Sequence, residues 1–341
     1  MAERQTVLVT GGSGYIASWC VARLLEEGYP VRTTVRRLDR EAEVRQAIAT
    51  VAPAASGGQL AFFAADLESD AGWREAVEGC RFVLHVASPL GASAPRDAQV
   101  LIRPARDGAL RVLRAAVAAG AERVVMTSSV AAIVSGHEPG RYDETSWTNL
   151  AAKDISAYDQ SKTIAERAAW DFVGKSGSAM TLSTVNPVFV VGPAMNADYS
   201  ASLTLISRLL KGEMPGIPNL GVAFVDVRDV ADLHFKAMLS PKAAGERFIA
   251  SAGFYWLGEV AAILREELGP AARKVPKWRV PDWLVRLTAI YDRPLSTILQ
   301  LLSQRFDFDA SKAQRLLDWR PRPARESILD CAHSLIKLKL V

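Results

Sequence analysis

The sequence has little cysteine and no long hydrophobic run. Its three cysteines, Cys20, Cys80 and Cys331, lie far apart in a chain of 341 residues. Such a set can form neither a disulfide framework nor a closed zinc site, so we expect small buried thiols in a reducing compartment, by default the cytoplasm. No apolar run approaches the roughly 18 residues of a membrane span, and the first apolar stretch is too short for a signal peptide.

Charge of either sign is not in large excess. The chain has 41 Lys and Arg against 37 Asp and Glu, a net charge of +4, and no long basic tract. We therefore do not expect nucleic acid or a membrane as a partner. With 49% hydrophobic and 23% charged residues, the composition is that of a globular protein with one large domain or two closely joined lobes.

Short β-branched runs alternate with longer helical patterns in the first half of the chain. Strands separated by helices of this length predict a doubly wound parallel α/β sheet of the Rossmann type. The expected strands are Thr6–Thr10, Val31–Val35, Leu60–Ala64, Phe82–Val86, Val124–Thr127 and Thr181–Val185, and the expected helices include Tyr15–Glu27 and Arg103–Ala119.

Beyond Pro193 the pattern is less regular. A strand at Ala223–Val227, a helix at Val230–Met238 and a strand at Arg247–Ala250 are expected to return to the sheet, whereas Val260–Leu268 and Trp283–Leu302 are mainly helical. We therefore expect a dinucleotide-binding domain of residues 1–191 plus 223–250. A smaller, mainly helical C-terminal substrate lobe would comprise residues 192–222 plus 251–341.

A glycine-rich loop connects the first expected strand to the first helix. It reads Thr10-Gly11-Gly12-Ser13-Gly14-Tyr15-Ile16-Ala17. Glycines between a strand and a helix permit a tight turn whose backbone N–H groups face a pyrophosphate. We therefore predict dinucleotide contacts at Gly11, Gly14, Tyr15 and Ile16.

The end of the second strand indicates which dinucleotide binds. An NAD site places an acidic residue there for the ribose 2′-hydroxyl, but Val31 to Leu38 contains no carboxylate. Arg36 and Arg37 stand there instead, and a guanidinium pairs well with a 2′-phosphate. NADP is therefore the predicted cofactor, against the alternative of a solvated basic face.

Asp66 follows the third strand, beside the first in a doubly wound sheet. It is placed to accept a hydrogen bond from adenine, with Leu67 next to it, or to cap a helix in the Asp70–Glu78 region.

Candidate catalytic residues occur at two later places. Tyr158 and Lys162 are four apart on one face of a helix that runs through Ala169. A neighbouring ammonium, together with a positively charged oxidised nicotinamide, favours the phenolate and is expected to lower the pKa of Tyr158. Ser128 and Ser129 end the fifth strand, where ligands bind in such sheets, and a serine hydroxyl there can bind a carbonyl oxygen.

Other polar and aromatic residues have structural explanations. His85, His137 and His234 have no metal-ligand spacing, and no metal is expected. Large aromatic residues can line a substrate pocket or simply pack in the core, namely Trp147, Phe189, Phe224 and Trp256.

Taken together, these segments resemble the extended short-chain dehydrogenases/reductases, and more closely the group of dihydroflavonol reductases, cinnamoyl-CoA reductases and aldehyde reductases. The resemblance covers nearly the whole chain. It rests on Thr10–Ala17, Gly28–Arg36, Val83–Pro89, Thr127–Ser129, Tyr158–Lys162, Asn186–Pro193, Val225–His234, Asp309–Ala313 and Leu317–Pro321.

The resemblance implies hydride transfer from NADPH to a carbonyl carbon of a small molecule. It implies that Ser129 orients the substrate oxygen, that Tyr158 is the proton donor, and that Lys162 also holds the nicotinamide ribose. It further implies contacts to the 2′-phosphate from Arg36 and to the rest of the cofactor from Val86, Ala87, Ser88, Pro187 and Val188. It is also compatible with a monomer or with a homodimer formed through helices Arg103–Ala119 and Tyr158–Ala169.

Two departures from the family pattern refine this expectation. Arg37 stands where relatives often have Asp, which favours NADP. The stretch Val130–Val134 is wholly apolar where flavonoid reductases place a polar Asn or Asp. Because an apolar wall cannot pair with flavonoid hydroxyls, a hydrophobic or aromatic aldehyde or ketone fits better.

Two other functions stay open. A nucleotide-sugar epimerase or dehydratase, or a sterol-type dehydrogenase, would use the same groups with tightly held NAD. A non-enzymatic NADP sensor would not need the Tyr158 and Lys162 pair, which this chain retains.

Overall fold

The computed structural model describes residues 5–53, 57–89, 97–153, 155–197, 201–288 and 299–341. These residues form a seven-stranded, all-parallel sheet in the order β11-β7-β5-β4-β1-β2-β3. Its strands are β1 (Val7–Val9), β2 (Val31–Val35), β3 (Leu60–Ala64), β4 (Phe82–His85), β5 (Arg123–Thr127), β7 (Thr181–Pro187) and β11 (Arg247–Ala250). The predicted doubly wound sheet is confirmed.

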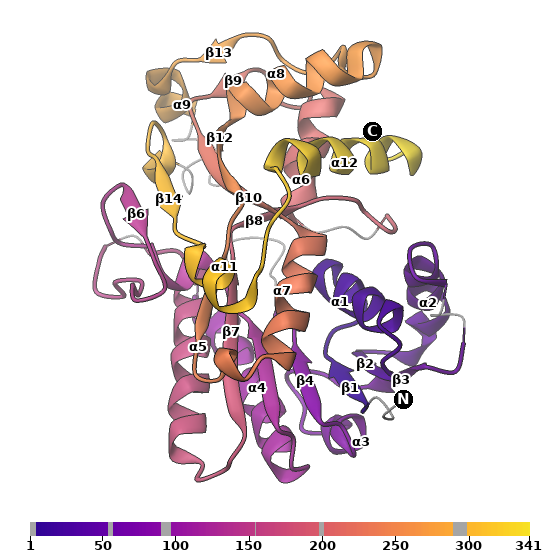
Figure 1. Cartoon of the computed structure of the whole chain (residues 1–341). Coiled ribbons are helices and arrows are strands. Elements are labelled where there is room, and N and C mark those ends of the chain that lie inside the picture. The colour runs from indigo at the N-terminus through magenta and orange to yellow at the C-terminus, as the bar shows by residue number, and fades with distance from the viewer. Residues whose placement is uncertain (1–4, 54–56, 90–96, 154, 198–200, 289–298) are drawn as a thin grey trace.

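Helices lie around the sheet and above it (Figure 1). They are α1 (Tyr15–Glu26), α2 (Glu41–Ala49), α3 (Trp73–Val77), α4 (Gln99–Ala118), α5 (Ala157–Lys175), α6 (Ala201–Lys211), α7 (Val227–Leu239), α8 (Leu257–Leu268), α9 (Asp282–Thr288), α11 (Ser311–Leu317) and α12 (Ala324–Lys337). Single 3₁₀ turns are η1 (Leu38–Arg40), η3 (Val130–Ala132), η4 (Pro241–Ala243), η5 (Gly269–Ala272) and η6 (Leu299–Leu301).

Both faces of the sheet are covered, which explains the continuous apolar strands. Val7 and Val9 pack with α1 and α7, whereas Leu8 between them packs with α3 and α4 on the other face. Side chains alternate along a strand, so a strand buried on both sides must be apolar at every position.

Smaller sheets join the C-terminal part to this core. They are β8 (Phe189–Val191) with β10 (Gly221–Asp226) and β12 (Gly253–Trp256); β9 (Ile217–Pro218) with β13 (Arg279–Val280); and β6 (Gly140–Tyr142) with β14 (Phe306–Phe308). The expected return of Ala223–Val227 to the main sheet is therefore wrong. Strand β11 occupies the edge beside β7, and β10 pairs with β8 instead.

The C-terminal lobe contains many helices, as expected, but one predicted helix is only partly described. Of Trp283–Leu302, α9 ends at Thr288, η6 is a short turn, and residues 289–298 lie outside the described part. The sheet of β8, β10 and β12 crosses the predicted lobe boundary, and that division stays a prediction. None of the described helices has both the length and the apolar character needed to cross a bilayer.

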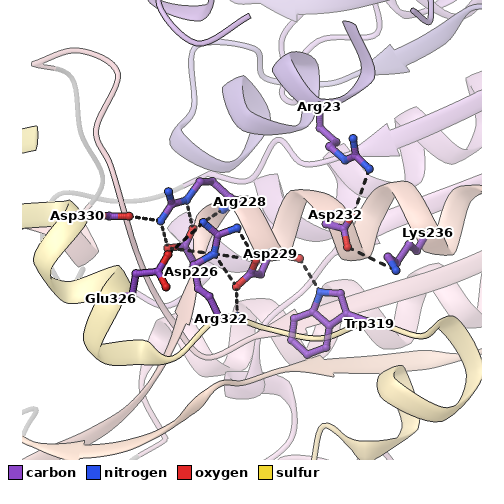
Figure 2. A network of polar contacts seen from close by, with 10 residues as sticks. All are labelled: Arg23, Asp226, Arg228, Asp229, Asp232, Lys236, Trp319, Arg322, Glu326 and Asp330. Carbon is purple, nitrogen blue, oxygen red and sulfur yellow. Dashed lines mark hydrogen bonds and ion pairs between the residues drawn. The ribbon is translucent and has the colours of Figure 1, made fainter. Parts of the chain in front are cut away.

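Two of the family-like segments meet where the C-terminal segment attaches to the sheet domain. Figure 2 shows Arg228 between Asp226 and Asp330 of α12, while Arg322 reaches Asp229 at the start of α7. Trp319, fully buried, donates its indole N–H to the Asp229 carbonyl at 2.8 Å. These contacts fix α12 and the preceding turn against α7.

Candidate active site

The glycine-rich loop lies at the carboxyl end of β1, next to the end of β4. Gly11 has φ +74°, and a Cβ there would lie 3.0 Å from Ala87 Cα. The Gly11 N–H donates to Thr34 Oγ1 at 2.9 Å, and the Gly14 N–H donates to the Gly11 carbonyl at 2.8 Å. Because β1 and β4 lie on opposite sides of the switch in strand order, the loop occupies the crevice where such sheets bind ligands.

A threonine that the sequence analysis did not single out holds this crevice together. Thr10 Oγ1 accepts hydrogen bonds from the N–H groups of Val86 and Ala87, both at 3.0 Å, and is hydrogen-bonded to His85 Nδ1. A small hydroxyl residue directly before the first glycine is the signal that could have identified it. Thr10 thus places Val86, Ala87 and Ser88 beside the loop.

Tyr15 and Ile16 open helix α1, as expected for residues that follow a phosphate loop. The Tyr15 ring packs against both the sheet core and the C-terminal core. Its buried hydroxyl has no hydrogen-bond partner among the described residues, and burial raises its pKa well above the usual range. Only the backbone of Tyr15 is therefore suited to a pyrophosphate.

The three arginines in and just after β2 differ in their surroundings. Arg36 and Arg37 are exposed just beyond the end of β2, and Arg37 forms an ion pair with Asp39. Arg32 instead donates to the carbonyls of Glu75 and Glu78. Arg36 and Arg37 are thus the arginines positioned to meet a 2′-phosphate.

Asp66 and Leu67 follow β3 at the same edge of the sheet. Asp66 Oδ1 accepts from the Glu68 N–H at 3.0 Å, and α3 begins only at Trp73 with Gly72 as its N-cap. The alternative of a helix cap is therefore wrong for Asp66, because the chain makes a turn before the helix starts. Leu67 packs against Gly108 of α4.

Strands β5 and β7 end beside each other. Pro187 and Val188 are buried, and Val188 donates its N–H to the Ala250 carbonyl at 3.1 Å. Ser129 follows β5 as the N-cap of η3, its Oγ accepting from the Ala131 N–H at 3.1 Å. The carboxyl ends of parallel strands thus bring Ser129 and Pro187 to one edge.

Tyr158 and Lys162 lie in the first turns of α5, which begins after the N-cap Ser156. The Lys162 Nζ is 5.9 Å from the centroid of the Tyr158 ring. Lys162 is 7% exposed, and burial lowers its pKa to about 8 although the Glu166 carboxylate opposes this shift. The structure thus brings Ser129, Tyr158 and Lys162 together, since the Ser129 side chain lies near enough to the Tyr158 phenol to lower its pKa.

In the protein by itself, the pKa of Tyr158 is raised rather than lowered. Burial raises it, and the nearby Ser129 side chain only partly offsets this shift. Burial disfavours the charged phenolate, so the phenol is protonated at neutral pH. That state suits a proton donor.

The expected apolar wall after Ser129 is mostly core. Ala131, Ala132 and Ile133 are buried, whereas Val130 and Val134 at the two ends are partly exposed. Of the four aromatic candidates, Phe224 is fully buried and belongs to the core. Trp147, Phe189 and Trp256 are partly exposed.

The histidines have structural roles or lie at the surface. His85 and His234 are buried, and burial lowers their pKa values to about 3 and about 4. His234 Nε2 is hydrogen-bonded to Thr127 Oγ1 at 2.7 Å, and exposed His137 contacts the Trp147 carbonyl. Within the described ranges, no group of three His, Cys, Asp or Glu side chains could hold a metal ion.

Comparison with known proteins identifies a family and several relatives that this chain resembles. The model of the NAD dependent epimerase/dehydratase family matches residues 7–251. Cinnamoyl-CoA reductase 1 of Arabidopsis thaliana is 35% identical over 288 residues, 81% of this chain and 77% of that protein. Dihydroflavonol 4-reductase of Zea mays is 32% identical over 289 residues, 82% of this chain and 77% of that protein.

Solved structures extend the likeness to the C-terminal lobe. The yeast methylglyoxal/isovaleraldehyde reductase Gre2, solved with NADPH, has a TM-score of 0.81 at 26% identity and covers 98% of this chain and 99% of its own. Vestitone reductase from alfalfa has a TM-score of 0.76 at 25% identity and covers 99% of this chain and 100% of its own. The predicted oxidoreductase class is confirmed, and the chain belongs to the NAD dependent epimerase/dehydratase family of extended short-chain dehydrogenases/reductases.

Proposed function

We propose that this protein reduces a hydrophobic aldehyde or ketone to an alcohol with NADPH. The observation that carries the proposal is the meeting of two sets of residues at one edge of the sheet. The glycine loop and Arg36 follow β1 and β2, and Ser129 follows β5 with the Tyr158 side chain near it.

The crevice fits a dinucleotide. A Cβ at Gly11 would crowd Ala87, so glycine leaves backbone open to a pyrophosphate at that point. We assign the pyrophosphate to the loop from Gly11 to Ile16, and the adenine to Asp66 and Leu67. The rest of the cofactor would lie along Val86–Ser88, Pro187 and Val188, with Lys162 at the nicotinamide ribose.

The choice of NADP follows from the end of β2. Arg36 is exposed there, no carboxylate ends the strand, and Arg37 lies beside it. The predicted cofactor is confirmed by the likeness to reductases solved with NADPH from yeast and from Candida albicans. A tightly held NAD, as the epimerase alternative requires, would lack its usual acidic partner.

When bound, NADPH supplies the hydride that adds to the carbonyl carbon. Ser129 Oγ donates a hydrogen bond to the carbonyl oxygen and orients it. Tyr158 Oη donates its proton to that oxygen as negative charge develops there. The ammonium of Lys162 stabilises the phenolate that remains.

The segment that follows Ser129 favours an apolar substrate. Val130 and Val134 are the partly exposed ends of the segment after Ser129, and the segment contains no Asn or Asp that could pair with flavonoid hydroxyls. Burying an unpaired hydroxyl is unfavourable, so a polyhydroxylated substrate should bind poorly.

NADPH consumption over a substrate panel tests the proposal. The panel comprises aliphatic and aromatic aldehydes, ketones, one dihydroflavonol and cinnamoyl-CoA, with NADH in parallel. We expect turnover of apolar carbonyls with NADPH. Tyr158→Phe should lower kcat by about 10²- to 10⁴-fold and leave NADPH affinity unchanged, because only the proton donor is lost.

Three other outcomes would point to a different function or mechanism. Bound NADPH without turnover of any carbonyl would contradict the reductase proposal and favour a sensor. NAD that copurifies with the protein would favour an epimerase or dehydrogenase. A Tyr158→Phe variant with full activity would remove Tyr158 from the mechanism.

A further inference from the structure

A fully buried carboxylate lies behind the candidate catalytic residues and has no part in the mechanism above. Glu166 is 0% exposed and lies one helical turn beyond Lys162 on α5. Its oxygens accept hydrogen bonds from Ser128, Trp170, Thr184, Asn186 and Arg247. These donors saturate the carboxylate of Glu166 and hold it rigidly.

One arm of this network reaches the backbone of Ser129. Asn186 Nδ2 donates to Glu166 Oε2 at 2.8 Å and to the Ser129 carbonyl at 3.2 Å. Ser128, the residue before, donates its hydroxyl to the same carboxylate oxygen and its N–H to the Val185 carbonyl. The end of β5 is thus attached to α5 through Glu166.

The other arm runs through Arg247, which is 8% exposed on β11. Its Nε donates to Glu166 Oε1 at 2.7 Å, and its Nη1 donates to the carbonyls of Glu144 and Ser146 at 2.7 and 2.8 Å. Its guanidinium carbon lies 3.8 Å from the centre of the Trp147 ring. Arg247 therefore holds segment 144–148, which carries Trp147, against α5.

Segment 144–148 returns to the turn after Ser129 and closes a ring of contacts. Thr148 donates its N–H to the Ala132 carbonyl at 3.0 Å and its hydroxyl to the Ala131 carbonyl at 2.6 Å, both in η3. Glu144 Oε1 in turn accepts from the Ile249 N–H on β11 at 3.0 Å. The turn after Ser129 is therefore held by Asn186 on one side and by segment 144–148 on the other.

We propose that the buried Glu166–Arg247 pair positions the catalytic set, holding Ser129 through Asn186 and through segment 144–148, and holding the charge of Lys162 beside Tyr158. A buried ion pair is weak evidence of stabilisation, because its desolvation opposes the mutual attraction. Both charges are also connected through hydrogen bonds to the turn after Ser129, so the pair can hold that turn in place. This inference rests on the proposed reductase function.

The double variant Glu166→Gln with Arg247→Met separates positioning from folding. It removes both charges of the pair, so neither Glu166 nor Arg247 is left without its partner, and its thermal unfolding should lie closer to wild type than that of Arg247→Met alone. We expect kcat to remain about 100-fold low because a reacting group displaced by about 1 Å loses roughly that factor. NADPH affinity, followed by fluorescence titration, should stay within about threefold of wild type.

Arg123→Met is the matched control. Arg123 is 6% exposed at the start of β5, the end of the strand far from Ser129, and also donates to backbone carbonyls. Its loss should lower thermal stability and leave kcat unchanged. If the Glu166→Gln/Arg247→Met protein has wild-type kcat, the positioning role is refuted and the pair is structural only.

The pH profile of the single variant Glu166→Gln provides a second test that does not depend on the double variant folding. The charged or titratable groups near Lys162 are Glu166 and Tyr158 on α5 and neutral His85 on β4, with Arg247 acting through Glu166. Without the carboxylate, Lys162 loses its proton at lower pH, so the basic limb of kcat should move down by about one pH unit. An unmoved limb overturns the inference.

The controls separate this inference from the proposed function. Wild-type protein that reduces no carbonyl refutes the function itself. Active wild-type protein whose variants match it in kcat and pH profile refutes only the positioning role.

Discussion

At the scale of single residues, the three arginines in and just after β2 have different surroundings. Arg36 makes no ion pair among the described residues, Arg37 is paired with Asp39, and Arg32 is turned toward the carbonyls that end α3. A guanidinium already bound to carbonyls cannot serve a phosphate. Arg36 is therefore expected to contribute more to cofactor choice than Arg37, which must leave Asp39 first.

Replacing both exposed arginines should change cofactor preference. We expect Arg36→Ala with Arg37→Ala to weaken NADPH binding by about 10- to 100-fold, since a hydrogen bond to a charged group contributes about 1.5–3 kcal/mol. NADH has no 2′-phosphate and should bind as before. Fluorescence titration with both cofactors measures the ratio.

Arg32→Ala is the control for this pair, because it removes a guanidinium of the same strand that faces α3. Its ratio of NADPH to NADH affinity should equal that of wild type. Equal losses for both cofactors in the Arg36→Ala/Arg37→Ala protein would refute the 2′-phosphate assignment.

At the scale of elements, the attachment of the C-terminal segment depends on a few partly buried charges. Asp229 is 6% exposed at the start of α7, and Arg322 donates to it from both its side chain and its backbone. Burial raises the pKa of Asp229 despite the bonds to Arg322, so the ionised carboxylate needs this partner.

Removing that partner should loosen the attachment. We expect Arg322→Ala to lower the free energy of unfolding by about 2–3 kcal/mol, less than for a fully buried pair because Arg322 is partly exposed. Urea unfolding measures the change. Arg320→Ala removes an arginine two positions away whose pair with Asp318 is exposed, so it should change stability by less than about 0.5 kcal/mol.

At the scale of the whole molecule, two buried neutral histidines join separate parts of the fold. His85 ties β4 to β1 through Thr10, and His234 ties α7 to β5 through Thr127. Burial lowers their pKa values from 6.5 to about 3 and about 4. Between pH 6.5 and about 4 the unfolded chain binds protons that the folded chain does not.

The folded protein should therefore lose stability as the pH falls below 6.5. His234→Gln removes one titrating group, so we expect the slope of unfolding free energy against pH to decrease by up to about 1.4 kcal/mol per pH unit. Urea unfolding from pH 7 to pH 5 measures the slope. An unchanged slope in the His234→Gln protein would contradict the assignment.

Much of the sheet domain could be predicted from local patterns. The bounds of β2 and β3 were predicted correctly, because each is a short run of β-branched or apolar residues. The glycine loop, the Ser128–Ser129 pair and the Tyr158–Lys162 pair were identified for the same kind of reason, whereas the choice of Ser129 came from the family resemblance. Each occurs at a strand end or on one helical face that short sequence spacing defines.

Contacts between distant segments could not be predicted in this way. The partner of β10, the turn at Asp66 and the core position of Ile133 depend on which elements already occupy the neighbouring space. The direction of the Tyr158 pKa shift likewise depends on burial by the whole fold.

Local spacing along the chain was therefore enough to predict the α/β class and to single out the glycine-rich loop, the serine pair after β5 and the Tyr158–Lys162 pair. The ring that joins Glu166 and Arg247 to the turn after Ser129 brings together residues up to 118 positions apart (129 to 247). Only tertiary packing places these charges together out of water. Burial makes their pairing necessary, and no pattern within a short segment encodes it.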